Sequence, residues 1–321
     1  MNRRYLLRRV LQFVPTTAAI LLAGFLLAHL APGDPVLALA GENGDAEYYA
    51  LMRAKFGLDE PLAQQLLTYV SNLARGDFGI SYVHGRPVLD IILERLPATL
   101  LLTTVALVLS SLAGVALGAF TATRRRRWSQ LSVTTTMLVL YAAPIFLVAQ
   151  VAILLLALGT GWFPIQGFDS AAGPRTGVAH LLDVAHHLAL PALVLASQEV
   201  AVVCRLTSVG LRDELVSDHV RTARSKGLPE RVVVARHALR GVLAPVFTVI
   251  GGRVGHLVAG AVVVESIFGW PGMGQLLVEA MRNRDSPIVL GVFVLIALAV
   301  VIANLLTDLV YSWLDPRVTS R

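Results

Sequence analysis

The sequence predicts an all-α membrane protein with six transmembrane helices, and three observations lead to this fold class. Of the 321 residues, 55% are hydrophobic and only 15% are charged, whereas roughly 25% of the residues of a soluble domain are charged. The apolar residues form long uncharged blocks, and the charged residues collect in the gaps between them. This composition excludes a water-soluble globular domain, and the excess of apolar residues also excludes a disordered chain.

Six blocks are long enough to cross a membrane as a helix, which needs roughly 20 mostly apolar residues. They are Val10–Ala31, Ala98–Thr123, Trp128 to about Leu158, Leu188 to about Leu206, Val242–Val264 and Ile288 to about Thr307. The first block starts with arginines, as a signal peptide does. Its apolar run is longer than the core of a typical signal peptide, so we interpret it as a retained span.

The distribution of arginine predicts the orientation of these spans. Four arginines precede the first span, Arg124 to Arg127 separate the second from the third, and eight cations lie from Arg205, at the end of the fourth span, to Arg240, before the fifth. The loop of residues 32–97, by contrast, has five cations and nine acids. Positively charged loops remain in the cytoplasm, so both termini are predicted to be cytoplasmic. Because the basic residues lie between apolar blocks, they do not indicate a nucleic-acid partner.

The spans divide the chain into three parts. Residues 1–31 form an N-terminal segment with the first span, residues 32–97 an extracytoplasmic cap, and residues 98–321 a domain with the other five spans. Helical structure is expected in the cap, because the apolar residues between Pro61 and Leu73 form one stripe at helical spacing.

A second long connection, from about Arg205 to Arg240, is predicted to form two cytoplasmic helices with a break. Gly227 suits the left-handed position that ends a helix, and Pro229 is well placed to begin the next one. We expect Gly227 to let the chain turn where a side chain would clash. A loop that only fixed the topology would not need two helices, so the pattern indicates a further role.

The sequence contains no pattern for catalysis or metal binding, so we expect no enzyme activity and no cofactor bound by this chain. Neither lysine follows a glycine, which excludes a P-loop for ATP phosphates. No histidine precedes a glutamate and no G-x-S-x-G elbow occurs, which excludes two common hydrolase sites. Asp183, His186 and His187 could be imagined as metal ligands, but adjacent histidines at a membrane boundary favour interfacial residues.

Several motifs resemble one known family. The segment from Asp218 to Leu228 reads DHVRTARSKGL, and RHALRGVLAP follows as far as Pro245. This sequence resembles the cytoplasmic EAA loop of ABC importer permeases, in particular that of their dipeptide, oligopeptide and nickel branch. Further matches are LAPGDP after the first span, ERLPATL at the start of the second, ESIFGWPGMG after the fifth and LDPR near the C-terminus. The large first outer loop is similar to that of the B-type subunit.

The resemblance implies that the EAA-like loop couples the chain to a separate ATPase. In such permeases a short helix sits in a groove on the ATPase and moves with it. The positions implied here are Asp218, Arg221, Ala223, Arg224, Lys226, Gly227 and Leu228. The basic residues would help to orient the docked loop, whereas an arginine-rich loop without this role would only fix topology or touch anionic lipid.

Three ionisable residues within the predicted spans are candidates for a translocation pathway. Glu199 lies in the fourth span, and Arg253 and His256 share one face of the fifth. Ionisable residues inside a membrane are costly and are functional candidates by default. They could contact a peptide terminus, or form a buried ion pair that holds two helices together. The sequence leaves both readings open.

Small residues at a spacing of four mark two places for close helix contacts. Gly114 and Gly118 lie in the second span, and Gly251 and Gly255 lie in the fifth. Such pairs let two helices approach closely, and a partner permease is one candidate for the second helix. Chance spacing in glycine-rich spans is the alternative.

The turn after the fifth span is a candidate outer gate. It consists of Glu265, Trp270, Pro271, Gly272 and Gly274. Irregular backbone near the membrane must be sheltered by protein, and glycine and proline suit a re-entrant turn. A plain surface turn before an interfacial helix is the alternative, and the sequence gives both similar support.

Together these features predict the membrane-spanning subunit of an ATP-driven importer for short peptides in a bacterial inner membrane. The resemblance implies a second permease subunit, two ATP-binding subunits that carry ATP and magnesium, and an extracytoplasmic binding protein. Nickel or another small solute is the alternative cargo. An ion-coupled secondary transporter and a membrane-embedded enzyme are the alternatives from other classes, and the two-helix loop argues against the first of them.

Overall fold

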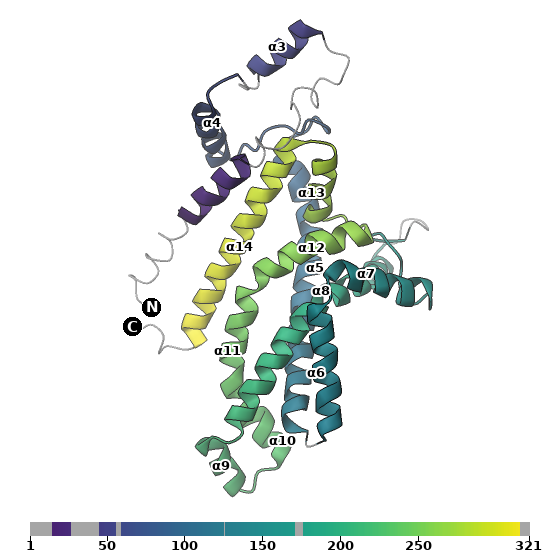
Figure 1. Cartoon of the computed structure of the whole chain (residues 1–321), viewed down its shortest axis with the longest axis vertical. Helices are drawn as coiled ribbons and strands as arrows, with labels where there is room; N and C mark the ends of the chain where they lie inside the picture. The colour runs from purple at the N-terminus through teal and green to yellow at the C-terminus, as the bar shows by residue number, and fades with distance from the viewer. Residues whose placement is uncertain (1–14, 27–44, 56–58, 125, 171–175, 315–321) are drawn as a thin grey trace. The chain divides into compact units, whose positions relative to one another are not determined.

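The computed structural model describes residues 15–26, 45–55, 59–124, 126–170 and 176–314, which are mainly helical (Figure 1). A first helix, Pro15–Leu26, precedes α3 (Ala46–Lys55), α4 (Leu62–Ala74), α5 (Val88–Thr123), α6 (Arg127–Ala142), α7 (Ile145–Ala152), the π-helical η1 (Ile153–Leu158), α8 (Val178–Glu214), α9 (Asp218–Ser225), α10 (Glu230–Val232), the π-helical η2 (Val233–Ala238), α11 (Leu239–Gly252), α12 (Val254–Phe268), α13 (Met273–Arg282) and α14 (Ser286–Leu314). Within the described ranges no strand forms, apart from one isolated bridge between Ile80 and Pro87. The predicted all-α fold class is confirmed.

Among the residues that the structure describes, four helical segments are long and apolar enough to cross a membrane unaided: α5, α8, the run Glu230–Gly252, and residues Ser286–Leu305 of α14. Two more spans result if bent pairs are joined, α6 with α7 and η1 across a bend of 110°, and α12 with α13 across a bend of 70°. The predicted second, fourth and sixth spans lie within α5, α8 and α14. Of the predicted first span, only the helix Pro15–Leu26 belongs to the described residues.

The predicted third span is sharply bent rather than straight. The helix α6 ends at Ala142, Ala143 is extended with ψ of 133°, and α7 begins after Pro144. A residue that precedes proline is pushed out of the helical region by the proline ring. Pro144 therefore explains the break within an apolar block that composition alone marks as one span.

The predicted fifth span, Val242–Val264, is also interrupted. The helix α11 ends at Gly252 and α12 begins at Val254, with Arg253 between them at φ −95° and ψ 0°. Figure 1 shows the ribbon changing direction from α11 to α12. The two glycines that precede Arg253 weaken the helix at this point, because glycine is a poor helix former.

The described chain separates into two compact units. One contains residues 100–270 and 302 onward, and the other contains residues 2–99 and 271–301. The core of the first unit joins α8, α9, η2 and α11, and its fully buried members include Leu211, Val220 and Val233. This core ties the predicted coupling loop to two helices of the spans.

The glycine pair of the predicted second span packs against α8 of the same chain. A Cβ atom on Gly114 would lie 2.5 Å from the Cβ of Val203, and one on Gly118 would lie 2.6 Å from the carbonyl oxygen of Cys204. Real Cβ atoms do not approach so closely, so glycine is required at both positions. The contact is thus an internal one between α5 and α8. In α11, a Cβ on Gly251 would clash with Thr307.

We expect Gly118→Ala to destabilise the protein by about 1–3 kcal/mol, because overpacking against fixed backbone has a cost of that order. The matched control is Gly252→Ala, where an added Cβ meets nothing within 4 Å. This control should be neutral or stabilise slightly, since alanine is the better helix former. The midpoint of thermal unfolding of the purified chain measures both. Equal midpoints for the two variants would contradict the close contact.

The second unit contains a buried carboxylate that holds an irregular loop. Asp285, at the start of α14, is 1% exposed. It accepts hydrogen bonds from the Ser81 hydroxyl and from the backbone amides of Tyr82 and Val83, the last two at 3.1 and 3.2 Å. Burial, and to a lesser extent the charge of Asp285, raises the pKa of Tyr82 to about 12. The carboxylate thereby joins the loop between α4 and α5 to the turn between α13 and α14.

Asp285→Ala should open this loop. A hydrogen bond to a charged group is worth roughly 1.5–3 kcal/mol. The three bonds to Asp285 are not additive, and water can solvate their donors once the loop opens, so we expect a net loss of about 2–4 kcal/mol. Hydrogen exchange at the Tyr82 and Val83 amides should accelerate by at least about tenfold. The control is Asp77→Ala, since Asp77 is exposed and accepts one hydrogen bond, from the Gly79 amide at 2.8 Å. Unchanged protection in Asp285→Ala would contradict the role of the carboxylate.

Candidate functional site

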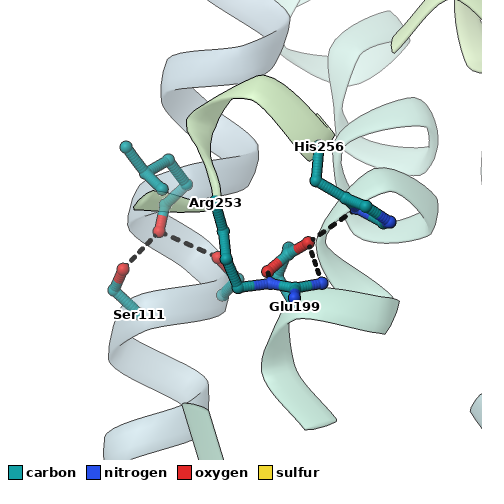
Figure 2. A network of polar contacts seen from close by, with 6 residues as sticks. Ser111, Glu199, Arg253 and His256 are labelled. Carbon is teal, nitrogen blue, oxygen red and sulfur yellow. Dashed lines mark hydrogen bonds and ion pairs between the residues drawn. The ribbon is translucent and has the colours of Figure 1, made fainter. Parts of the chain in front are cut away.

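The three ionisable residues of the predicted spans form one cluster (Figure 2). Arg253 donates from Nε and Nη2 to the two carboxylate oxygens of Glu199, the second bond at 2.9 Å. His256 Nδ1 lies 3.1 Å from Glu199 Oε1. The side chain of Glu199 is 5% exposed, that of Arg253 is 22% exposed and that of His256 is 57% exposed. The buried ion pair, one of the two readings left open by the sequence, is thus present.

The residue next to Glu199 holds the other interrupted span. Gln198 donates from Nε2 to the carbonyl oxygen of Ala143 at 3.0 Å. The amides of Leu147 and Val148 donate to Pro144 instead, so Gln198 satisfies a carbonyl that the kinked helix leaves aside. Two consecutive residues of α8 therefore contact the breaks of two spans. No sequence pattern marks Gln198, because glutamine is neutral and its partner lies 55 residues away along the chain.

This place in the fold is suited to contact with a polar solute. Irregular backbone at membrane depth is tolerated where protein or a water-filled cavity shelters it, and broken helices form the solute sites of many transporters. Figure 2 also draws Ser111 on α5, whose hydroxyl donates to the Leu107 carbonyl of the same helix at 2.6 Å. The ionisable groups of the cluster are Glu199, Arg253 and His256.

The predicted coupling loop consists of a helix, a hinge and a second helix. The helix α9 ends at Ser225, and Gly227 follows in the left-handed conformation with φ of 75°. The backbone then enters α10 at Pro229, whose carbonyl accepts from the amides of Val232 and Val233. A Cβ on Gly227 would meet nothing within 4 Å. The expected steric reason for this glycine is therefore wrong, and the positive φ explains it instead.

Arg224 bridges the hinge between α9 and α10. Arg224 donates from Nε and Nη2 to the two oxygens of Glu230 at 3.2 and 2.7 Å, and from Nη1 to the Leu215 carbonyl at 3.0 Å. The hydrogen bond to Glu230 raises the already high pKa of Arg224 further. This arginine thus links α9 to α10 and to the end of α8. Arg221, with a side chain 70% exposed, and Lys226 remain available on the surface.

The small position of the loop faces inward. Ala223 is 4% exposed and Val220 is fully buried, and both belong to the core that contains Val233 and Val242. Asp218 lies at the exposed start of α9 and pairs with Arg221 at 3.7 Å, and Leu228 is 36% exposed. The loop is consequently anchored by its apolar face and presents its charged face outward.

Comparison with known proteins identifies the family. The model of the binding-protein-dependent transport system inner membrane component matches residues 114–320, and the model of the N-terminal part of such components matches residues 2–103. The chain belongs to this family. The glutathione transport system permease protein GsiC of Escherichia coli K12 is 36% identical over 314 residues, 98% of each chain. The dipeptide transport system permease protein DppB of the same strain is 36% identical over 333 residues, again 98% of each chain.

Among solved structures, a chain of an amino acid ABC transporter is similar. The alignment covers 71% of the present chain and 94% of the transporter chain, with a TM-score of 0.48 and 15% sequence identity.

The candidate outer gate of this inner membrane component is a buried turn. Gly269 ends α12 in the left-handed conformation, and Trp270 is fully buried. The ring of Trp270 lies 4.8 Å from that of Phe168, and the carbonyl of Phe268 accepts from the Gly167 amide at 2.9 Å. Glu265 is fully buried as well. The segment before α8 thus covers the turn, which a plain surface turn would not need.

The remaining members of the gate prediction lie at the start of α13. Gly272 precedes this helix, Gly274 is buried within it, and the Met273 amide donates to the Thr99 hydroxyl at 2.8 Å. Pro271 lies between Trp270 and Gly272, where the backbone leaves α12. A gating function of this turn stays a prediction.

Asp183 and His186 form hydrogen bonds with the segment before α8, and His187 forms one within α8. Asp183 accepts from the amide and the hydroxyl of Ser170, both at 2.7 Å. His187 Nδ1 lies 2.9 Å from the Asp183 carbonyl, and His186 Nε2 lies 2.8 Å from the Trp162 carbonyl. No group of three potential metal ligands occurs among the residues that the structure describes.

Proposed function

We propose that the chain is the permease subunit of an ATP-driven importer for short peptides. The observation that carries the proposal is the hinged loop: α9 and η2 share a buried core with α8 and α11, so force applied to α9 would reach the spans. Arg221 and Lys226 are exposed on the surface of the loop, where an ATPase partner would dock. Membership of the binding-protein-dependent family supports the importer class, and the names of the glutathione and dipeptide relatives support a peptide cargo.

The proposed mechanism is alternating access. ATP binding closes a pair of ATP-binding subunits, the loop of residues 218–240 moves inward, and the pathway opens to accept solute from an extracytoplasmic binding protein. Hydrolysis by those subunits, with their ATP and magnesium, reverses the movement. The chain itself supplies the path and no catalytic group. A second permease subunit completes the path, and the loop and both termini face the cytoplasm.

The test reconstitutes the chain with its partner permease, ATP-binding subunits and binding protein in lipid vesicles. Labelled dialanine, glutathione and Ni²⁺ are offered with and without ATP. We expect ATP-dependent uptake of at least one of the two peptides and none of Ni²⁺. Uptake by the isolated chain on an ion gradient would overturn the importer class in favour of a secondary transporter, and uptake of Ni²⁺ alone would overturn the peptide cargo.

A further inference from the structure

The more exposed members of the cluster of Glu199, Arg253 and His256 are its two nitrogen-bearing side chains. Glu199, the only acceptor of the three, is 5% exposed, whereas Arg253 and His256 are 22% and 57% exposed. The carboxylate therefore lies behind its two donors. A solute that reaches the cluster meets a guanidinium and an imidazole before it meets the acid.

Arg253 and His256 each have a nitrogen that does not bond to Glu199. Arg253 uses Nε and Nη2 for that carboxylate, which leaves the hydrogens of Nη1, since a guanidinium has five N–H donors in a fixed plane. His256 uses Nδ1, and its second ring nitrogen, Nε2, donates as well when the ring carries both protons. Glu199 thus fixes the orientation of both side chains and leaves one nitrogen of each for a ligand.

The charges of the cluster favour an anion. The Arg253 guanidinium is always charged, and the carboxylate of Glu199 is the less exposed partner, so the accessible side of the ion pair is its cationic side. Arg253 also immediately precedes α12, a helix of 15 residues, and His256 lies in the first turn of that helix. The start of a helix carries a partial positive charge and unpaired amides, which adds to the attraction. A metal cation such as Ni²⁺ would be repelled by the Arg253 guanidinium.

We propose that Arg253 and His256, oriented by Glu199, bind a free carboxylate group of the transported solute. A guanidinium forms short, strong hydrogen bonds with carboxylates, and an imidazole that carries both protons can add another. The site lies where both interrupted spans contact α8, so the bound group would sense the movement of α6, α7, α11 and α12. The inference rests on the proposed peptide importer and adds the chemical group that the permease itself recognises.

The test compares dialanine, which has a free carboxylate, with dialanine amide, which lacks it. ATP-driven uptake of both is measured in vesicles with the assembled importer, and the acid-to-amide ratio is taken for each variant of this chain. The binding protein is the same throughout, so its own preference cancels when ratios are compared. His256→Asn retains a donor toward Glu199 and removes the outer nitrogen, and His84→Asn makes the same change at an exposed histidine outside the spans.

We expect the acid-to-amide ratio to fall about tenfold in His256→Asn, which corresponds to one charge-assisted hydrogen bond, and to stay unchanged in His84→Asn. The neutral pair Glu199→Gln with Arg253→Gln should lower it at least as far. An unchanged ratio in His256→Asn, with dialanine uptake intact, overturns the carboxylate site and leaves the importer in place. Absence of ATP-driven uptake of both peptides by the wild-type assembly overturns the proposed function instead.

Discussion

Gly227→Val is expected to impair ATP-driven transport strongly while the chain still folds and inserts. A β-branched residue at φ of 75° is strained by roughly 1–3 kcal/mol. Release of this strain would rotate α10 against α9 and break the contacts of Arg224 with Glu230. The loop would then no longer match a fixed groove on its ATPase. We expect uptake to drop at least about tenfold, measured in vesicles with the partner subunits.

The control for this prediction is Gly227→Asn, because asparagine tolerates the left-handed conformation. An added side chain meets open space at this position, so Gly227→Asn should transport at about the wild-type rate. If the glycine were needed for steric room, asparagine and valine would be equally harmful. Wild-type transport by Gly227→Val would reject the hinge altogether. Co-purification of the ATP-binding subunits separates lost docking from lost force transmission.

The contrast between these two explanations shows what a sequence can tell about such a loop. The pattern of Gly227 and Pro229 predicts where the helices end, because left-handed glycine and helix-starting proline are local features. The neighbours of Gly227 depend on how the loop folds back on α8 and η2, which no local pattern encodes. Arg224 illustrates the same limit, since its partners Glu230 and Leu215 follow from tertiary packing.

The spans themselves are predictable because composition and length decide whether a segment crosses a membrane. The interruptions within the spans are harder to predict from the sequence. Pro144 could have been read as a break from the restriction it imposes on Ala143, but the bend of 110° depends on packing. Arg253 and Glu199 could be named as partners because ionisable residues inside a membrane need one another. Gln198 and Asp285 carried no such signal, since their importance lies in contacts far along the chain.

The largest stability effect is expected at the ion pair. Arg253→Met leaves Glu199 buried with only His256 as a partner, and breaking a buried pair in this way costs about 3–5 kcal/mol. The thermal midpoint of the purified chain should fall on the order of 10 °C, since about 1 kcal/mol corresponds to a few degrees in a protein of this size. Adding Glu199→Leu removes the orphaned charge and should restore most of the loss.

The double variant decides what the pair is for. In a double-mutant cycle, groups in direct contact show a coupling of about 0.5–3 kcal/mol or more, so additive losses would contradict the bidentate contact. A pair of apolar residues often replaces a buried ion pair without a stability cost. If the double variant is as stable as the wild type and still transports dialanine with the wild-type acid-to-amide ratio, the ion pair serves only as a structural contact between helices. If it is stable but no longer discriminates the amide, the charges are kept for the solute, because stability does not require them.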